Sequence, residues 1–185
     1  TVSAIRSKLA QPIPLGYCHV GQVLDASEVP GFAAGDRVVS NSPHAEVVSA
    51  SPAFVARIPA SVSDEHAAFT PLAAIALQGL RLLDAKPGET VVVMGLGLIG
   101  QLAVRLLRAR GVNVIGVDPD DAKRTDAKQA GALVPELGAS LFTLRPPGGV
   151  TGVLITASTP SSEPVNQAAR LCRRRGRVVL VGVTG

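Results

Sequence analysis

Hydrophobic and polar positions along the chain follow two different patterns. From residue 91 onward, short uncharged apolar runs alternate with segments in which apolar residues recur every three or four positions. This pattern predicts strands alternating with helices, and therefore an α/β fold with a parallel, doubly wound sheet. The expected strands are 91–94, 112–117, 133–134, 153–156 and 178–181, and the expected helices are 98–110, 120–130 and 163–172.

The first 60 residues show short apolar runs that Gly and Pro interrupt, which indicates an irregular antiparallel sheet or partial barrel. The expected strands are 20–24, 37–39, 45–48 and 54–58, and residues 5–9 resemble the end of a helix. After Ile58-Pro59 the pattern becomes helical, with Ser61 or Ser63 as a cap and a longer helix from about 73 to 83. We therefore predict two domains, residues 1–60 and 61–185.

The strand at 91–94 leads directly into a glycine motif. Gly95, Gly97 and Gly100 have the spacing G-x-G-x-x-G, and an amphipathic helix follows them. A dinucleotide pyrophosphate site requires this order: the first glycine allows a sharp exit from the strand, the second lets the backbone approach the phosphates, and the third lets the helix pack closely. The helix amino end then presents free N–H groups to the anion.

An acidic residue ends the next expected strand. Asp118 lies 18 residues beyond Gly100, close to the interval of about 20 residues at which a carboxylate binds the ribose hydroxyls of NAD. The alternative is a βαβ unit without a nucleotide, in which Asp118 caps the following helix. The combined motif favours the dinucleotide site.

Composition narrows the function classes. The chain of 185 residues is 46% hydrophobic, with 19 Gly, four Phe, one Tyr and no Trp. The net charge of +4 comes partly from arginines near a helix end, Arg173, Arg174, Arg175 and Arg177, where cations complement the helix dipole. With so few aromatic residues to stack bases, we expect no nucleic-acid partner.

The sequence shows no targeting signal and no disulfide framework, so we expect a cytoplasmic protein. Cys18 and Cys172 are too few for a disulfide framework, and no signal peptide or membrane-length apolar run is present. We therefore expect no membrane association. The chain begins with Thr1 and ends just after a strand, so we expect it to be truncated at both ends, with the sixth strand of the sheet beyond Gly185.

Several short motifs together resemble the medium-chain dehydrogenase/reductase superfamily, whose best-known members are zinc alcohol dehydrogenases. They are GDRVV (35–39), AEV (45–47), RIP (57–59), KPGET (86–90), GLGLIG (95–100), GVD (116–118) and AGA (130–132). The resemblance implies a partial GroES-like barrel followed by a Rossmann sheet. Residues 2–17, 41–46 and 74–79 resemble more narrowly the N-terminal module of bacterial bi-domain oxidoreductases, in which a further domain follows.

The resemblance also implies a set of cofactor-binding residues. The phosphate loop matches Gly95, Leu96, Gly97, Leu98, Ile99 and Gly100, and the ribose-binding acid matches Asp118. Lys123 matches a lysine beside the adenosine ribose, although it is equally a solvated helix lysine. Ala157, Ser158, Gly182 and Val183 match the loops that flank the nicotinamide. Asp118 favours NAD over NADP, because a carboxylate repels the 2′-phosphate.

The zinc ligands of the family do not match. Tyr17 stands where alcohol dehydrogenases have a histidine ligand, and Thr70, Pro71 and Leu72 stand where a cysteine is expected. Only residues 41–44 separate the two strands between which the structural zinc lobe would lie, so we expect no zinc. Tyr17 is the candidate catalytic residue, as a hydrogen-bond donor to a substrate oxygen; alternatively, it fills the space left by the metal.

These inferences lead to one main hypothesis with two rivals. The chain is predicted to be a zinc-independent, NAD-dependent oxidoreductase acting on a small alcohol or carbonyl compound, and to form a homodimer. The first rival is a non-catalytic dinucleotide-binding module of a larger protein. The second is a zinc-dependent alcohol dehydrogenase whose ligands lie outside this chain.

Overall fold

The protein is described by a computed structural model that covers residues 14–144 and 146–184. It divides into two compact units, Thr1–Pro71 and Leu72–Gly185. The predicted domain boundary after residue 60 stays a prediction, and the helix end expected at residues 5–9 lies outside the described residues.

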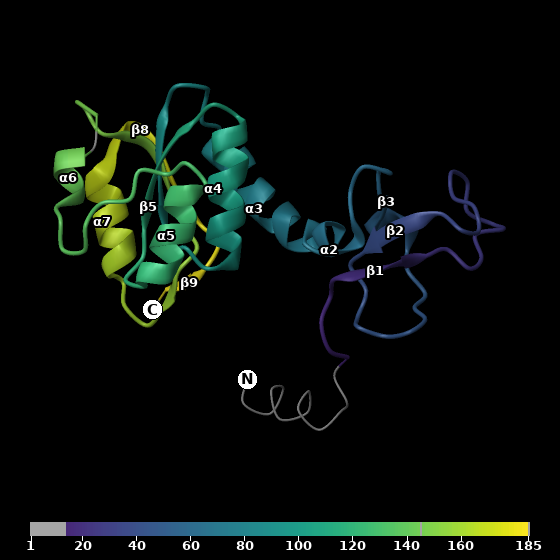
Figure 1. The fold of residues 1–185 in the computed structure, drawn as a ribbon. Coiled ribbons are helices and arrows are strands. Elements are labelled where there is room, and N and C mark those ends of the chain that lie inside the picture. Colours follow the sequence, from purple (N-terminus) through teal and green to yellow (C-terminus); the bar gives the residue numbers. More distant parts are fainter. Residues whose placement is uncertain (1–13, 145, 185) are drawn as a thin grey trace. The chain divides into compact units, whose positions relative to one another are not determined.

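The first unit contains a three-stranded antiparallel sheet in the order β1-β2-β3 (Figure 1). The strands are β1 (His19–Gln22), β2 (Arg37–Ser40) and β3 (Val55–Arg57), and η1 (Pro52–Phe54) precedes β3. One face of this sheet carries a small core of Val39, Ile58 and Ala67. The expected antiparallel sheet is therefore present, although it is smaller than the pattern predicts.

The prediction of a strand at residues 45–48 is wrong. The segment is irregular, and Val47 is 66% exposed. No strand in the described part of the chain pairs with it, and an apolar alternation forms a strand only where a partner is available.

Helices begin after β3 at one of the two caps that the sequence suggests. The Ser63 hydroxyl accepts a hydrogen bond from the backbone N–H of His66, which starts α2 (Asp64–Ala67). Asp64 and Glu65 lie in its first turn, where negative charge complements the helix dipole. The longer helix α3 (Thr70–Leu83) begins three residues before the expected position.

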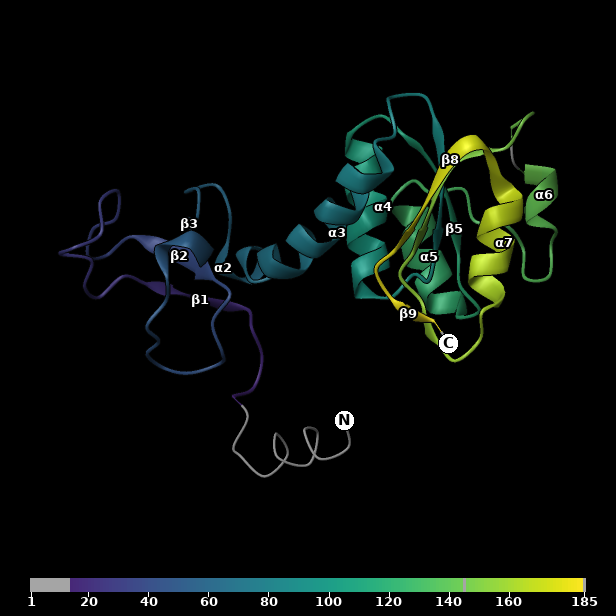
Figure 2. The ribbon, with the colours of Figure 1, turned by 180° about the vertical axis from the view of Figure 1, so that it is seen from behind.

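The second unit is built on a four-stranded parallel sheet in the order β5-β4-β6-β8 (Figure 1; Figure 2 shows the same sheet from behind). Its strands are β4 (Thr90–Met94), β5 (Asn113–Val117), β6 (Val150–Ile155) and β8 (Cys172–Leu180). The strand expected at 133–134 is wrong, because only Leu133 forms a single parallel bridge to Ile115. Two short strands, β7 (Ser158–Thr159) and β9 (Val183–Thr184), pair separately.

Helices cover both faces of this sheet, so the predicted doubly wound α/β fold is confirmed. The helices are α4 (Leu98–Ala109), α5 (Asp121–Gln129), α6 (Leu141–Leu144) and α7 (Glu163–Leu171). Val91 and Val93 of β4 pack in a core with α3, α4 and α5, whereas Val92 and Met94 pack with α7. Because β4 is buried on both faces, its uninterrupted apolar run is typical of a central parallel strand.

The described residues include no helix with both the length and the apolar character needed to cross a membrane.

Candidate functional site

The glycine motif lies where the strand order of the sheet reverses. β4 has β5 on one side and β6 on the other, and the helices that follow β4 and β6 cover opposite faces. In open α/β sheets, ligands bind at the carboxyl ends of the strands at such a switch point. Gly95 follows β4 directly, and its N–H donates to the Val117 carbonyl at 2.8 Å.

Packing explains two of the three glycines. Gly95 has φ 93°, and a Cβ there would lie 2.5 Å from the backbone nitrogen of Ala157. A Cβ on Gly100 would lie 2.0 Å from the Gly95 carbonyl oxygen. Both contacts are shorter than real atoms allow, so a side chain at either position would force the backbone to move.

Gly97 differs from the other two glycines. It is the N-cap of α4 in extended backbone, and a Cβ there would meet no heavy atom within 4 Å. The space in front of the helix is therefore open, and the first-turn N–H groups of Leu98, Ile99 and Gly100 lie beside it. Such a helix start accepts the negative charge of a phosphate. Leu98 is 48% exposed at the same place.

Asp118 lies at the end of β5 and holds the glycine loop. One carboxylate oxygen accepts a hydrogen bond from the Leu96 N–H at 2.7 Å, and the other accepts one from the Asp120 N–H at 2.9 Å. An ionised carboxylate offers about four acceptor positions. Two backbone bonds therefore leave Asp118 with capacity for ribose hydroxyl groups.

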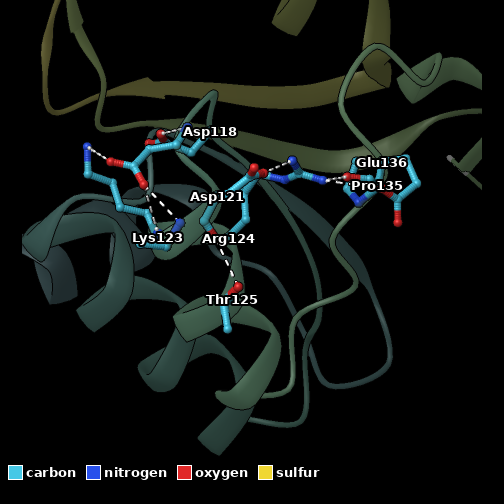
Figure 3. Close-up of polar contacts among 9 residues, drawn as sticks. Asp118, Asp121, Lys123, Arg124, Thr125, Pro135 and Glu136 are labelled. Carbon is cyan, nitrogen blue, oxygen red and sulfur yellow. Dashed lines mark hydrogen bonds and ion pairs between the residues drawn. The ribbon is translucent and has the colours of Figure 1, made fainter.

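Lys123, in the first turn of α5, has its ammonium group next to another carboxylate. Its Nζ lies 3.4 Å from Asp120 Oδ2 (Figure 3). Asp120 is the N-cap of α5, and the backbone N–H of Lys123 in particular holds the pKa of the Asp120 carboxyl below its ordinary value. The proposed role of Lys123 at the ribose stays a prediction.

The residues expected to flank the nicotinamide lie at the same edge of the sheet. The Ala157 N–H donates to the Met94 carbonyl at 3.1 Å, and a Cβ on Gly182 would lie 2.0 Å from the Ala157 oxygen. Ser158 and Val183 are register partners in the β7–β9 pair. The structure thus brings the loops after β4, β6 and β8 into direct contact.

Two further polar residues hold this edge, and neither belongs to a motif recognised in the sequence. The Thr156 hydroxyl donates to the Gly95 carbonyl at 2.6 Å. The Gln101 amide donates to the carbonyls of Leu96, at 3.0 Å, and Lys123, at 2.7 Å. Each is a polar residue beside an apolar run; this signal marks the residue but does not identify its partner.

Tyr17 belongs to the first unit, and its side chain is 50% exposed. Its catalytic role stays a prediction. Within residues 14–144 and 146–184, no three His, Cys, Asp or Glu side chains gather in a way that could ligate a metal. The described residues therefore do not fit a catalytic zinc site, and zinc independence stays a prediction.

A doubly wound parallel sheet, a glycine turn at its switch point and an acid at the end of the neighbouring strand define a dinucleotide-binding fold of the Rossmann type. Residues 99–185 match the family model described as "Zinc-binding dehydrogenase". An alcohol dehydrogenase of Moraxella sp. (strain TAE123) is 36% identical over 148 residues, and D-guloside 3-dehydrogenase of Escherichia coli (strain K12) is 30% identical over 154 residues.

A solved structure shows the same likeness. The putative zinc-binding dehydrogenase of Sinorhizobium meliloti 1021 bound to NADP superposes with a TM-score of 0.80 at 27% sequence identity, covering 95% of this chain and 62% of that one. The chain belongs to the medium-chain dehydrogenase/reductase superfamily. Each of the two relatives above matches 77% of the chain, which spans only 43% and 44% of their respective lengths.

Proposed function

We propose that the chain carries the NAD-binding site of an oxidoreductase that transfers a hydride between the nicotinamide and an alcohol or carbonyl compound. The main support is the bond between Asp118 and the Leu96 N–H, 2.7 Å long. It joins the residue suited to the adenosine ribose to the loop suited to the pyrophosphate. The names of the relatives agree with this reaction class, since those relatives are alcohol and sugar-derivative dehydrogenases.

The charges around Asp118 favour NAD over NADP. Asp118 itself is negatively charged, and the two cations at the start of α5, Lys123 and Arg124, form ion pairs with neighbouring acids. Lys123 lies beside Asp120, and Arg124 binds Asp121 at 2.6 Å and the Pro135 carbonyl at 2.8 Å (Figure 3). A 2′-phosphate would therefore meet the Asp118 carboxylate, while both nearby cations already have acidic partners. The structure bound to NADP belongs to a neighbour at 27% identity, and titration with both cofactors measures the preference of this chain.

Different residues of the chain are proposed to bind different parts of the cofactor. The open helix start at Gly97 would receive the pyrophosphate, and Asp118 would accept the ribose hydroxyls. The backbone around Ala157, Ser158, Gly182 and Val183 would border the nicotinamide, which supplies the hydride chemistry when bound. Tyr17 is proposed to donate a hydrogen bond to the substrate oxygen; the alternative, a role in packing only, predicts unchanged turnover in Tyr17→Phe.

The test combines binding and turnover. The purified protein is titrated with NAD and NADP by calorimetry, then mixed with NAD and a panel of alcohols and sugars while the absorbance of NADH is followed. NAD binding with turnover supports the proposal, whereas NAD binding without turnover across the panel favours the non-catalytic module. Elemental analysis checks the metal: stoichiometric zinc that resists dialysis would contradict zinc independence. The homodimer, the further domain and the cytoplasmic location stay predictions.

A further inference from the structure

The peptide groups on either side of Leu96 are held by side chains from two different elements. The N–H donates to Asp118 at the end of β5, and the carbonyl accepts from the Gln101 amide in α4. The Leu96 side chain is 0% exposed, so this residue is fixed through its backbone and its side chain alike. Leu96 stands between Gly95 and Gly97, at the centre of the loop proposed to bind the pyrophosphate.

The orientation of the Gln101 amide is determined by its neighbours. Its nitrogen faces two carbonyl oxygens, those of Leu96 at 3.0 Å and Lys123 at 2.7 Å, and these require a donor. Its oxygen accepts from the Arg105 guanidinium at 3.1 Å. A carboxylate of the same shape would put negative charge against both carbonyls, so this position requires an amide rather than an acid.

Through these bonds Gln101 connects the two segments that face opposite ends of the adenosine diphosphate half of a dinucleotide. Leu96 lies in the glycine loop, and Lys123 lies in the first turn of α5, just after the segment that carries Asp118. Asp118 joins the same two segments from the other side. The loop and the ribose acid are therefore held at a fixed separation before any ligand arrives, which reduces the ordering that binding requires.

We propose that Gln101 is a positioning residue for the cofactor, which sets the distance between the pyrophosphate loop and the ribose-binding carboxylate. It acts through Leu96 and Lys123 and does not itself touch the cofactor. The inference rests on the proposed function, because it assumes that this edge binds NAD.

The first experiment measures NAD binding by calorimetry in Gln101→Met and Gln101→Glu. Methionine keeps the length of the side chain without the donor, and we expect the Kd for NAD to rise about tenfold, as the loss of two hydrogen bonds would give. Glutamate should weaken binding at least as much. The matched control is Gln167→Met on α7, a helical glutamine whose amide donates to Glu163 at 3.1 Å; its Kd should not change.

A second measurement distinguishes positioning from general stability. Gln101→Met is also made in the Asp118→Ala background. If both side chains act through the same loop, the second substitution should change the Kd by less than about twofold, because coupled residues are not additive. A residue with only a structural role would lower the melting temperature and weaken binding by the same factor in both backgrounds.

The outcomes separate the two proposals. Unchanged NAD affinity in Gln101→Met, or an equal loss in both backgrounds, would overturn the positioning role while the proposed function stands. Failure of the unaltered protein to bind NAD would instead overturn the proposed function, and the positioning role with it. A tenfold loss confined to the background that retains Asp118 supports the inference.

Discussion

The two ends of the parallel sheet in the second unit differ in the contacts that hold their loops. At the carboxyl end, side chains bind backbone groups: Asp118 and Gln101 bind Leu96, and Thr156 binds Gly95. At the amino end, ion pairs accompany bonds of this kind: the Glu89 carboxylate accepts a hydrogen bond from the Lys86 N–H at 2.8 Å, and the Arg177 guanidinium donates to the Leu82 carbonyl at 3.1 Å. Glu89 pairs with Arg173 at 2.7 Å, and Asp84 pairs with Lys86 and Arg177.

This difference suits the carboxyl end of the sheet to ligand binding and the amino end to support of the fold. Bonds from partly buried side chains to the backbone fix the course of a loop, and salt screens them little. Exposed ion pairs contribute only about 0–1 kcal/mol each and weaken as salt is added. We therefore expect changes at the carboxyl end to affect ligand binding strongly, and changes at the amino end to affect stability slightly.

The largest effect is expected for Gly95→Ala. The residue has φ 93°, and the new Cβ would lie 2.5 Å from the Ala157 nitrogen. The backbone of two adjoining loops must then shift, in addition to a cost of about 1–2 kcal/mol for left-handed backbone. We expect a loss of stability above about 3 kcal/mol in urea unfolding and no measurable NAD binding.

The amino end of the same sheet supplies the control. Gly88 has φ 83°, but a Cβ there would meet no atom within 4 Å. Gly88→Ala should therefore lose only the conformational cost, about 1–2 kcal/mol, and bind NAD normally. Equal losses in the two variants would show that the crowding at the carboxyl end is unimportant.

Asp118→Ala should have the next largest effect. The substitution removes the bond to the Leu96 N–H and the proposed acceptor of the ribose hydroxyls. Bonds to a charged group contribute about 1.5–3 kcal/mol, so the Kd for NAD should rise roughly 10- to 100-fold. The preference over NADP should narrow, because the charge that repels the 2′-phosphate is gone. Calorimetry with both cofactors measures these changes, and Asp126→Ala removes the same charge from α5 as a control; unaltered affinities in Asp118→Ala would refute the assignment.

The sequence was most informative where a pattern is long or a backbone requirement is strict. The two strands and the helix between residues 90 and 117 were predictable because each apolar pattern extends over a whole element. The glycine turn was predictable because its spacing reflects backbone contacts, such as that between Gly100 and the Gly95 carbonyl. Two of the short patterns failed: residues 45–48 have no partner strand in the described part of the chain, and Leu133, 53% exposed, forms a single bridge.

The supporting residues of the site could not be predicted in the same way. Gln101 and Thr156 bind main-chain carbonyls, which every residue possesses, so no side-chain pairing in the sequence indicates their partners. The Thr156 partner, Gly95, is 61 positions away in the sequence. Only the folded sheet brings the ends of β4 and β6 together, and with them these contacts.

The smallest effect is expected at the amino end, for Glu89→Gln. The backbone N–H of Lys86, and to a lesser degree Arg173, hold the pKa of the Glu89 carboxyl below its ordinary value against the opposing effect of burial. The folded state thus favours the carboxylate, so its stabilisation is complete above the unfolded pKa of about 4.3 and is lost as pH falls through the lower folded pKa.

Glu89→Gln should cost less than about 1 kcal/mol at pH 7 and should flatten the loss of stability in acid. Urea unfolding at pH 7 and below pH 4 measures both, with Glu28→Gln, an exposed loop residue, as the charge control. The loss of unfolding free energy in Glu89→Gln could prove equally large in high salt, or the dependence of stability on acid pH could stay as in the unaltered protein. Either result would mean that the amino end is held as rigidly as the carboxyl end.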